Sequence, residues 1–275
     1  MKNENIIEYG ILNDEIVEQN IIEEKLRTKK TKVYDVLRLI NSKPLYLEDH
    51  LRRLNRSINL AGYKKEILEK DFKKDIEKLV VKSGRTNNNI KTTYYEDGES
   101  VRILYMVESK YPSKEKHKEG YKTILIYEER ENPNAKILNQ ERRKIVNSIL
   151  KEEGADEAIF LTENKVVLEG SRSNLFFVKG EKIITSPDER VLLGTTRQKI
   201  LKICENNNIS ILKREIMLDE LNFFDAAFVT GTSIDIMPLN RIDSVRYNTG
   251  NKVIKKLTDY YSKEKMRYLK NYKRA

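Results

Sequence analysis

The chain reads VLEGSRSNLFF from Val167 to Phe177, and this stretch does most to decide the fold. One acid, Glu169, precedes a turn of small residues, and an apolar strand follows the turn. This order places a single carboxylate at a strand end, where it can face a cavity and hold a ring nitrogen protonated. An ordinary hairpin turn with a solvent-facing glutamate is compatible with the same sequence, so this interpretation needs support from the rest of the chain.

Three further segments have residue types that suit a phosphorylated cofactor bound to a lysine. Lys136, in NAKILN, is predicted to open a helix over 135–153, where a lysine can be desolvated and lose its proton. LGTTR at 193–197 is predicted to begin a helix and to offer N–H groups and hydroxyls to an anion. VTGTSID at 229–235 is a hydroxyl-rich loop after a strand. A surface lysine, a helix N-cap and a plain turn would explain each segment taken singly.

The remaining pattern predicts an α+β chain in two halves. A β-branched run at 33–40 predicts a strand, and leucines at helical spacing predict a helix over 47–61. We expect a smaller N-terminal α/β domain at 1–115 and a larger C-terminal domain at 121–275 that carries Lys136. The polar segment 109–120 is the predicted interdomain linker.

Composition excludes several kinds of site. A single cysteine rules out an internal disulfide, and two histidines, His50 and His117, argue against a zinc site or a Ser-His-Asp triad. We therefore expect no metal, and we expect Cys204 to be buried and inert. The net charge is +10, but 43 acids interleave with the cations, so we expect no nucleic-acid partner. No apolar run could span a bilayer and no signal-peptide core is visible, which predicts a cytoplasmic protein without a membrane partner.

The order and spacing of the four segments resemble one family. The series K-x-L-N, E-G-S-x-S-N-x-F, L-x-G-x-T-R and V-T-x-T is similar to that of fold-type IV pyridoxal-phosphate enzymes, the class IV aminotransferases. These include branched-chain aminotransferases, D-amino-acid aminotransferases and aminodeoxychorismate lyases. Upstream, VYDVLR at 33–38 resembles the family's V-[YF]-E-x-[IL]-R strand, and HLRRLNRS at 50–57 resembles its H-x-x-R-L-x-x-S helix. The likeness covers most of residues 33–243 and implies a two-domain α+β fold.

The resemblance also implies roles for individual residues. Lys136 would hold pyridoxal 5'-phosphate as a Schiff base and move the α-proton, and Glu169 would pair with the ring nitrogen. The residues implied to bind the phosphate are Arg53, Thr195 through its N–H, Thr196 and Thr232. The residues implied to lie beside the ring or the substrate are Ser173, Arg172, Tyr34 and Ser233.

The chain departs from the family near the expected substrate. Three lysines, Lys29, Lys30 and Lys32, replace small residues of the family, and Asp35 replaces a glutamate. The R-G pair that D-amino-acid aminotransferases and aminodeoxychorismate lyases carry after the strand at 101–107 is absent. Val101-Arg102-Ile103 resembles instead the I-R-P of branched-chain enzymes, which makes Arg102 a hypothetical ligand of the substrate carboxylate.

These observations favour a transaminase that moves an amino group between a branched-chain-like or general amino acid and a 2-oxo acid. A 4-amino-4-deoxychorismate lyase that releases pyruvate and a D-amino-acid aminotransferase are the alternatives within the family. A basic binding protein that has lost turnover is the alternative of another class; the altered 29–32 segment favours it, and intact Lys136 and Glu169 oppose it. The resemblance further implies a homodimer.

Overall fold

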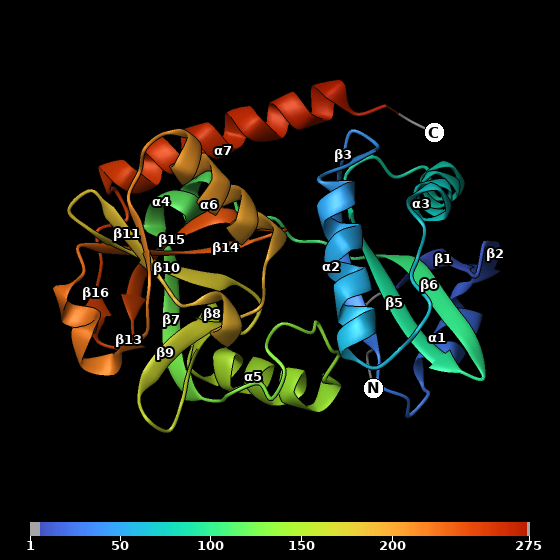
Figure 1. Ribbon diagram of the computed structural model, residues 1–275, viewed down its shortest axis with the longest axis horizontal. Helices are drawn as coiled ribbons and strands as arrows, with labels where there is room; N and C mark the ends of the chain where they lie inside the picture. Colours follow the sequence, from blue (N-terminus) through green and yellow to red (C-terminus); the bar gives the residue numbers. More distant parts are fainter. Residues whose placement is uncertain (1–5, 274–275) are drawn as a thin grey trace. The chain divides into compact units, whose positions relative to one another are not determined.

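The computed structural model describes residues 6–273, which pack as two compact units (Figure 1). The first unit comprises residues up to Lys110, Ala135–Leu138 and the chain from Lys265 on; the second comprises Tyr111–Asn134 and Asn139–Glu264. Each unit has its own β-sheet with helices, in agreement with the expected α+β class. Between residues 6 and 273, no helix is long and apolar enough to cross a membrane.

The first unit is built on a six-stranded sheet of order β2-β1-β6-β5-β3-β4. Its strands are β1 (Ile6–Leu12), β2 (Glu15–Glu18), β3 (Val33–Ile40), β4 (Lys43–Pro44), β5 (Asn89–Asp97) and β6 (Glu99–Val107). Its helices are α1 (Gln19–Leu26), α2 (Leu47–Leu60) and α3 (Glu69–Ser83). Every second residue of β3 is buried, as the alternation of a strand requires. The core formed by that face packs against α2 and α3, while Ile22 of α1 packs with Tyr105 in a separate cluster.

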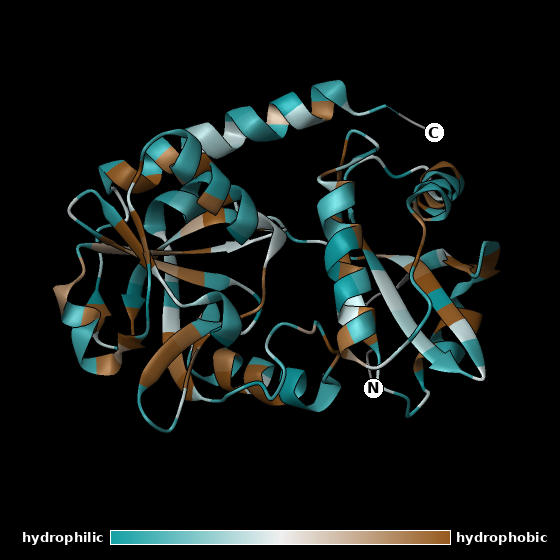
Figure 2. Cartoon of the chain, viewed as in Figure 1, coloured by the Kyte–Doolittle hydropathy of each residue, from teal (hydrophilic) through white to brown (hydrophobic). Residues whose placement is uncertain are grey.

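The second unit is built on a larger mixed sheet, whose main path runs β12-β11-β10-β14-β15-β7-β8-β9-β13, with β16 paired to β15. The first five of its strands in chain order are β7 (Tyr121–Tyr127), β8 (Glu157–Leu161), β9 (Val166–Gly170), β10 (Asn174–Lys179) and β11 (Lys182–Thr185). The others are β12 (Ile211–Lys213), β13 (Ile216–Met217), β14 (Ala226–Gly231), β15 (Asp235–Ile242) and β16 (Val245–Arg246). Figure 2 shows hydrophobic residues along these strands, which form the core.

The helices of the second unit are α4 (Lys114–Glu119), α5 (Gln140–Glu152), α6 (Thr195–Asn206) and the first part of α7 (Lys252–Asn271), whose last residues belong to the first unit. Cys204 of α6 is buried, as expected, and free, and burial raises the pKa of its thiol to about 12, which disfavours the reactive thiolate.

The structure differs from the predicted helix over 135–153. Helix α5 begins only at Gln140, where the side chain of Asn139 accepts from the N–H of Arg142. The preceding Ala135–Leu138 is not helical, and the N–H of Ile137 donates to the carbonyl of Ala135 (2.9 Å). Ile137 pairs with Val33, and the N–H of Leu138 donates to the carbonyl of Lys32 (2.7 Å). The backbone groups of this short piece thus form hydrogen bonds with the start of β3 and the residue before it. Lys136 therefore packs in the first unit, whereas we predicted that the C-terminal domain carries it.

The predicted linker at 109–120 is also narrower than expected. Half of it, Lys114–Glu119, forms α4, whose first turn is capped by the Ser113 hydroxyl accepting from the N–H of Lys116. Lys116 pairs with Asp156 (2.9 Å), and the Asn240 amide donates to the carbonyls of Glu119 and Gly120. These contacts make α4 part of the second unit, so the first boundary between units lies between Lys110 and Tyr111.

Candidate functional site

In the first unit, Lys136 is held on both sides through its backbone. Its carbonyl accepts from the N–H of Tyr34 (2.9 Å), and its own N–H donates to the Ser57 hydroxyl (3.1 Å). Its ammonium nitrogen lies 4.8 Å from the centroid of the Tyr34 ring. The segment therefore presents the lysine amine at a fixed place on the face of the sheet that carries Tyr34.

Two more polar residues of β5 share that face. Thr93 pairs with Tyr34 across the strands, and Lys91 lies two residues earlier, which puts both side chains on the same side of the sheet. The Lys91 ammonium is 4.9 Å from the Tyr34 ring centroid, and the residue is only 2% exposed. The buried Thr93 hydroxyl has no hydrogen-bond partner among residues 6–273. The ammonium groups of two lysines thus lie close to one tyrosine ring. The sequence did not reveal this arrangement, because Lys91 belongs to the polar run Lys91-Thr92-Thr93, in which no alternation singles it out.

Arg53 is positioned by a buried acid and a buried histidine. Asp35 accepts from Arg53 Nε (2.7 Å) and Nη2 (3.0 Å), and it contacts His50 Nδ1 at 2.6 Å. Burial alone would raise the pKa of Asp35, but the Arg53 charge and the His50 contact outweigh it and hold that pKa well below its usual range. Burial, with the nearby Arg53 charge, lowers the pKa of His50 despite the opposing effect of Asp35. These contacts occupy Nε and Nη2 of Arg53, so its Nη1 is the nitrogen that can meet an anion.

Ser57 connects Arg53 with Lys136. Its hydroxyl donates to the Arg53 carbonyl (2.9 Å) while it accepts from the N–H of Lys136. One turn of α2 therefore carries both the cation and the hydroxyl that fixes the lysine segment. The sequence held a signal for this role, because Ser57 follows Arg53 at helical spacing in HLRRLNRS.

The structure does not bring Arg102 to the same face as Lys136. Arg102 pairs with Tyr94, which pairs with Val33, so its side chain lies on the side of α2 and α3. There its guanidinium binds Asp75 of α3 (Nε, 2.9 Å) and Asp14 (Nη2, 2.5 Å). Burial raises the pKa of Asp75, and Arg102 opposes that rise. Arg102 is thus committed to carboxylates of its own chain, and we do not retain it as the ligand of a substrate carboxylate.

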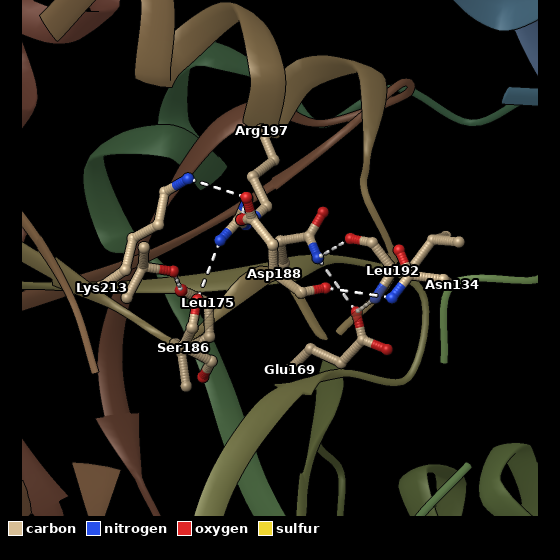
Figure 3. Close-up of polar contacts among 10 residues, drawn as sticks. Asn134, Glu169, Leu175, Ser186, Asp188, Leu192, Arg197 and Lys213 are labelled. Atoms are coloured by element: carbon tan, nitrogen blue, oxygen red, sulfur yellow. Dashed lines mark hydrogen bonds and ion pairs between the residues drawn. The ribbon is translucent and has the colours of Figure 1, made fainter. Parts of the chain in front are cut away.

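In the second unit, Glu169 lies at the end of β9 and is 3% exposed, so it is not the solvent-facing glutamate of an ordinary hairpin. Its Oε2 accepts from the amide of Asn174 (3.0 Å) and from the N–H of Leu192 (3.1 Å), as Figure 3 shows for Leu192. Its Oε1 lies 3.4 Å from Nε of Arg130. Two neutral donors therefore fix Oε2 of the carboxylate, and the charge of Arg130 lies next to Oε1.

The other two predicted segments of this unit meet the turn that follows Glu169. A Cβ on Gly194 would lie 2.1 Å from Oδ1 of Asn174, so only glycine fits against that turn. Asn174 pairs with Thr230 across β10 and β14, and a Cβ on Gly231 would lie 3.6 Å from the Arg172 carbonyl. The strand end with Glu169, the start of α6 and the end of β14 thus gather in one place.

This gathering contains groups that suit a phosphate. Helix α6 begins after Gly194 without a side-chain cap, which leaves its first N–H groups to other partners. The hydroxyls of Thr195 and Thr230 are buried, and neither has a hydrogen-bond partner within residues 6–273. Thr196 is buried beside Thr195, and Thr232 follows β14 in a turn, half-buried. An unpartnered hydroxyl at the N-terminus of α6, together with a second one near the end of β14, fits an anion that accepts several hydrogen bonds.

A family model described as Amino-transferase class IV matches residues 32–242, well over half of the chain. The chain belongs to the class IV aminotransferase family. D-alanine aminotransferase of Bacillus licheniformis is 27% identical over 231 residues, 79% of this chain and 81% of that protein. A probable branched-chain-amino-acid aminotransferase of Rickettsia bellii is 25% identical over 224 residues, 77% and 78% of the two chains.

Among solved structures, the branched-chain amino acid aminotransferase of Thermobaculum terrenum, with pyridoxal phosphate bound, superposes with a TM-score of 0.81 at 23% identity, over 98% of each chain. This likeness confirms the expected fold. Class IV aminotransferases and their solved relatives of this fold bind pyridoxal phosphate, and the family acts on amino acids and keto acids.

Other predicted residues of this class IV aminotransferase have partners within the chain. The Ser173 hydroxyl donates to Oε2 of Glu157 (3.0 Å), and Ser171 donates to Oε1 (2.6 Å). Glu157, which is 3% exposed, was not anticipated; it fixes the turn after Glu169. Ser173 therefore acts on that turn through Glu157. The Arg172 side chain is exposed, and Ser233 is half-buried in the turn after β14.

Arg197, the last residue of the G-x-T-R motif, is fully buried. Its Nη1 binds Asp188 (2.6 Å) and its Nη2 donates to the Ser186 carbonyl (2.8 Å), and Lys213 binds the other oxygen of Asp188 (Figure 3). Arg197 thus anchors the first turn of α6 to the 186–188 segment. The described part of the chain contains no group of three or more His, Cys, Asp or Glu side chains that could hold a metal ion.

Proposed function

We propose that this class IV aminotransferase moves an amino group between an amino acid and a 2-oxo acid, with pyridoxal phosphate bound covalently to Lys136. The observation that carries the proposal is the two-sided fixing of Lys136 by Tyr34 and Ser57, next to Arg53 on the same helix as Ser57. Bound pyridoxal phosphate would act as an electron sink for the bonds of the substrate's α-carbon.

The residues of each unit fit this cofactor. Arg53 would supply a cation for the phosphate through Nη1, because Asp35 already occupies Nε and Nη2. Thr195, Thr196 and Thr232 would supply N–H and hydroxyl donors at the N-terminus of α6 and after β14. Glu169, which is fixed through Oε2, would face the ring nitrogen with its negative charge.

Lys136 would also act as the acid and base. Its Nζ is the group that would take the α-proton from the substrate and return it. Its backbone is bound on both sides, which limits how far the amine can move. The Tyr34 ring beneath the amine restricts the side chain further and lines the substrate side.

We propose Lys91, in place of Arg102, as the cation that binds a carboxylate of the substrate. Lys91 is 2% exposed, and its ammonium lies against the same Tyr34 ring as the amine of Lys136. The unpartnered Thr93 hydroxyl lies on the same face and would donate to the same carboxylate. Replacing Lys91 with Met should raise the KM for amino acids at least tenfold, which corresponds to about 1.4 kcal/mol of lost binding. R102M should leave that KM unchanged.

The spectrum of the purified protein tests the proposal. The parent should show a visible band of bound pyridoxal phosphate, and K136A should lose it. The matched control is K144A, because Lys144 is an exposed lysine of α5. No band in the parent, or an equal band in K136A, would overturn the assignment of Lys136.

Amino donors then sort the substrates. We expect L-leucine or another L-amino acid to convert the band to that of the amine form, and we expect D-alanine not to do so. Conversion by D-alanine alone would instead assign the chain to the D-amino-acid enzymes.

We also propose that the enzyme is a homodimer, which light scattering of the purified holoenzyme tests.

A further inference from the structure

Arg130, which the sequence did not single out, reaches Glu169 from the loop between β7 and α5. Its Nε lies 3.4 Å from Oε1 of Glu169, and its Nη2 donates to the Ser171 carbonyl (3.1 Å). The guanidinium carbon is 5.9 Å from the centroid of the Phe160 ring. One cationic side chain thus touches both the carboxylate and the turn that follows it.

The contact between Arg130 and Glu169 has an unusual geometry. The Nε atom of Arg130 is buried and makes no hydrogen bond within residues 6–273, so at 3.4 Å it acts on Glu169 by charge alone. The hydrogen bonds that Glu169 accepts from Asn174 and Leu192 both go to Oε2, and both come from neutral groups. The Arg130 cation faces the other oxygen, Oε1.

A cation at this place changes what the carboxylate can do. A positive charge beside a carboxylate favours its ionised form and weakens its hold on a proton. A carboxylate next to a pyridine nitrogen shares one proton with that nitrogen, so the same cation also disfavours a protonated, positively charged ring. The low exposure of Glu169 strengthens both effects, because little water screens the charges.

We propose that Arg130 is a positioning residue that keeps Glu169 ionised and in place, and that limits how firmly the ring nitrogen of bound pyridoxal phosphate holds a proton. The inference rests on the proposed function and adds to it a means of tuning the cofactor. A merely structural Arg130 would affect the turn through Ser171 and would leave the protonation of the ring unchanged.

The test is the titration of the ring nitrogen in the holoenzyme. The parent, R130M and R130K are loaded with pyridoxal phosphate labelled with nitrogen-15 in the ring, and the ring signal is followed by NMR from acid to alkaline pH. In R130M the midpoint should rise by at least about one pH unit, because an opposing cation is gone. R130K should stay near the parent, because it keeps the charge without the planar group.

The control is R142M, because Arg142 is an arginine of the same unit that pairs with Glu128 (3.2 Å) and does not contact Glu169. Its midpoint should equal that of the parent. R130Q is measured beside R130M. If R130M is insoluble, R130Q still tests the effect of a neutral side chain at this position. Equal midpoints in the parent and the neutral variants would overturn the role of Arg130 while leaving Lys136 assigned. A parent that binds no labelled cofactor would overturn the proposed function itself.

Discussion

Arg53 and Arg102 both reach buried aspartates on the helix-covered face of one sheet, but the two pairs differ in how well the carboxylate is satisfied. Both carboxylate oxygens of Asp35 accept hydrogen bonds from Arg53, and Asp35 also contacts His50. In Asp75 only Oδ2 binds Arg102, and the buried Oδ1 has no hydrogen-bond partner within residues 6–273. The pKa of Asp35 is accordingly lowered and that of Asp75 is raised. Complete satisfaction of a buried carboxylate, more than the presence of an arginine, decides whether it stays ionised.

The largest effect should come from R53M, which leaves Asp35 buried without its cation. Breaking such a pair by removing one partner costs about 3–5 kcal/mol. Urea unfolding of the apoenzyme should show this loss, and the affinity for pyridoxal phosphate should fall at least tenfold, as expected when a charge-assisted contact of about 1.5–3 kcal/mol is removed. Unchanged cofactor affinity in R53M would separate Arg53 from the phosphate.

R102M should cost less, about 1–3 kcal/mol, because Asp75 can take up a proton when its cation is removed. The affinity for pyridoxal phosphate should stay at the parent value. A loss of affinity as large as in R53M would break the comparison between the two arginines.

S57A should cost about 1–2 kcal/mol, because the N–H of Lys136 loses its acceptor. We expect a slower return of pyridoxal phosphate to the apoenzyme, measured by the growth of the visible band. S83A is the control, since Ser83 lies at the end of α3 and its hydroxyl donates to the carbonyl of Val80. Equal rates in S57A and S83A would contradict a role for Ser57 in fixing the lysine.

The smallest effect concerns pH. Because the pKa of His50 is lowered in the folded protein, the unfolded chain binds more protons below about pH 6.5, and stability should fall as the pH drops through that range. The slope is at most about 1.4 kcal/mol per pH unit for one proton. Asp35, whose pKa is also lowered, adds a second loss below about pH 4. The melting temperature of H50Q should vary less between about pH 6.5 and pH 5 than that of the parent, and an equal dependence would contradict the assignment.

The sequence predicted those parts of the molecule that depend on neighbours along the chain. Strand β3 and helix α2 follow from periodicity, and the turn after Glu169 follows from its small residues. The Asp97-Gly98 turn signal predicts the hairpin of β5 and β6, but the face occupied by Arg102 also depends on the pairing of β5 with β3, a strand far upstream that no local pattern reveals. Arg130 was missed for the same reason, because the role proposed for it depends on its contact with Glu169, which is remote in sequence.

The predicted helix over 135–153 failed at its start for a related reason. Ile137 and Leu138 fit the helical period, but their backbone groups find better partners at the open edge of β3. The helix therefore begins where Asn139 can cap it. The hydrophobic period of a segment does not show that its backbone groups can bond instead to a strand far upstream in the chain.

The discontinuous first unit has a consequence for how the chain is made. Its sheet is synthesised early, but the Lys136 segment arrives later, and the Tyr268 hydroxyl that accepts from the N–H of Leu47 (2.9 Å) arrives near the end. Ribosomes add about 5–20 residues per second, so the early sheet waits several seconds with its edge and the start of α2 unfinished. The second unit, almost continuous in the chain, is complete before the first. The piece that emerges first is thus the last to be finished, and exposure to chaperones falls mainly on it.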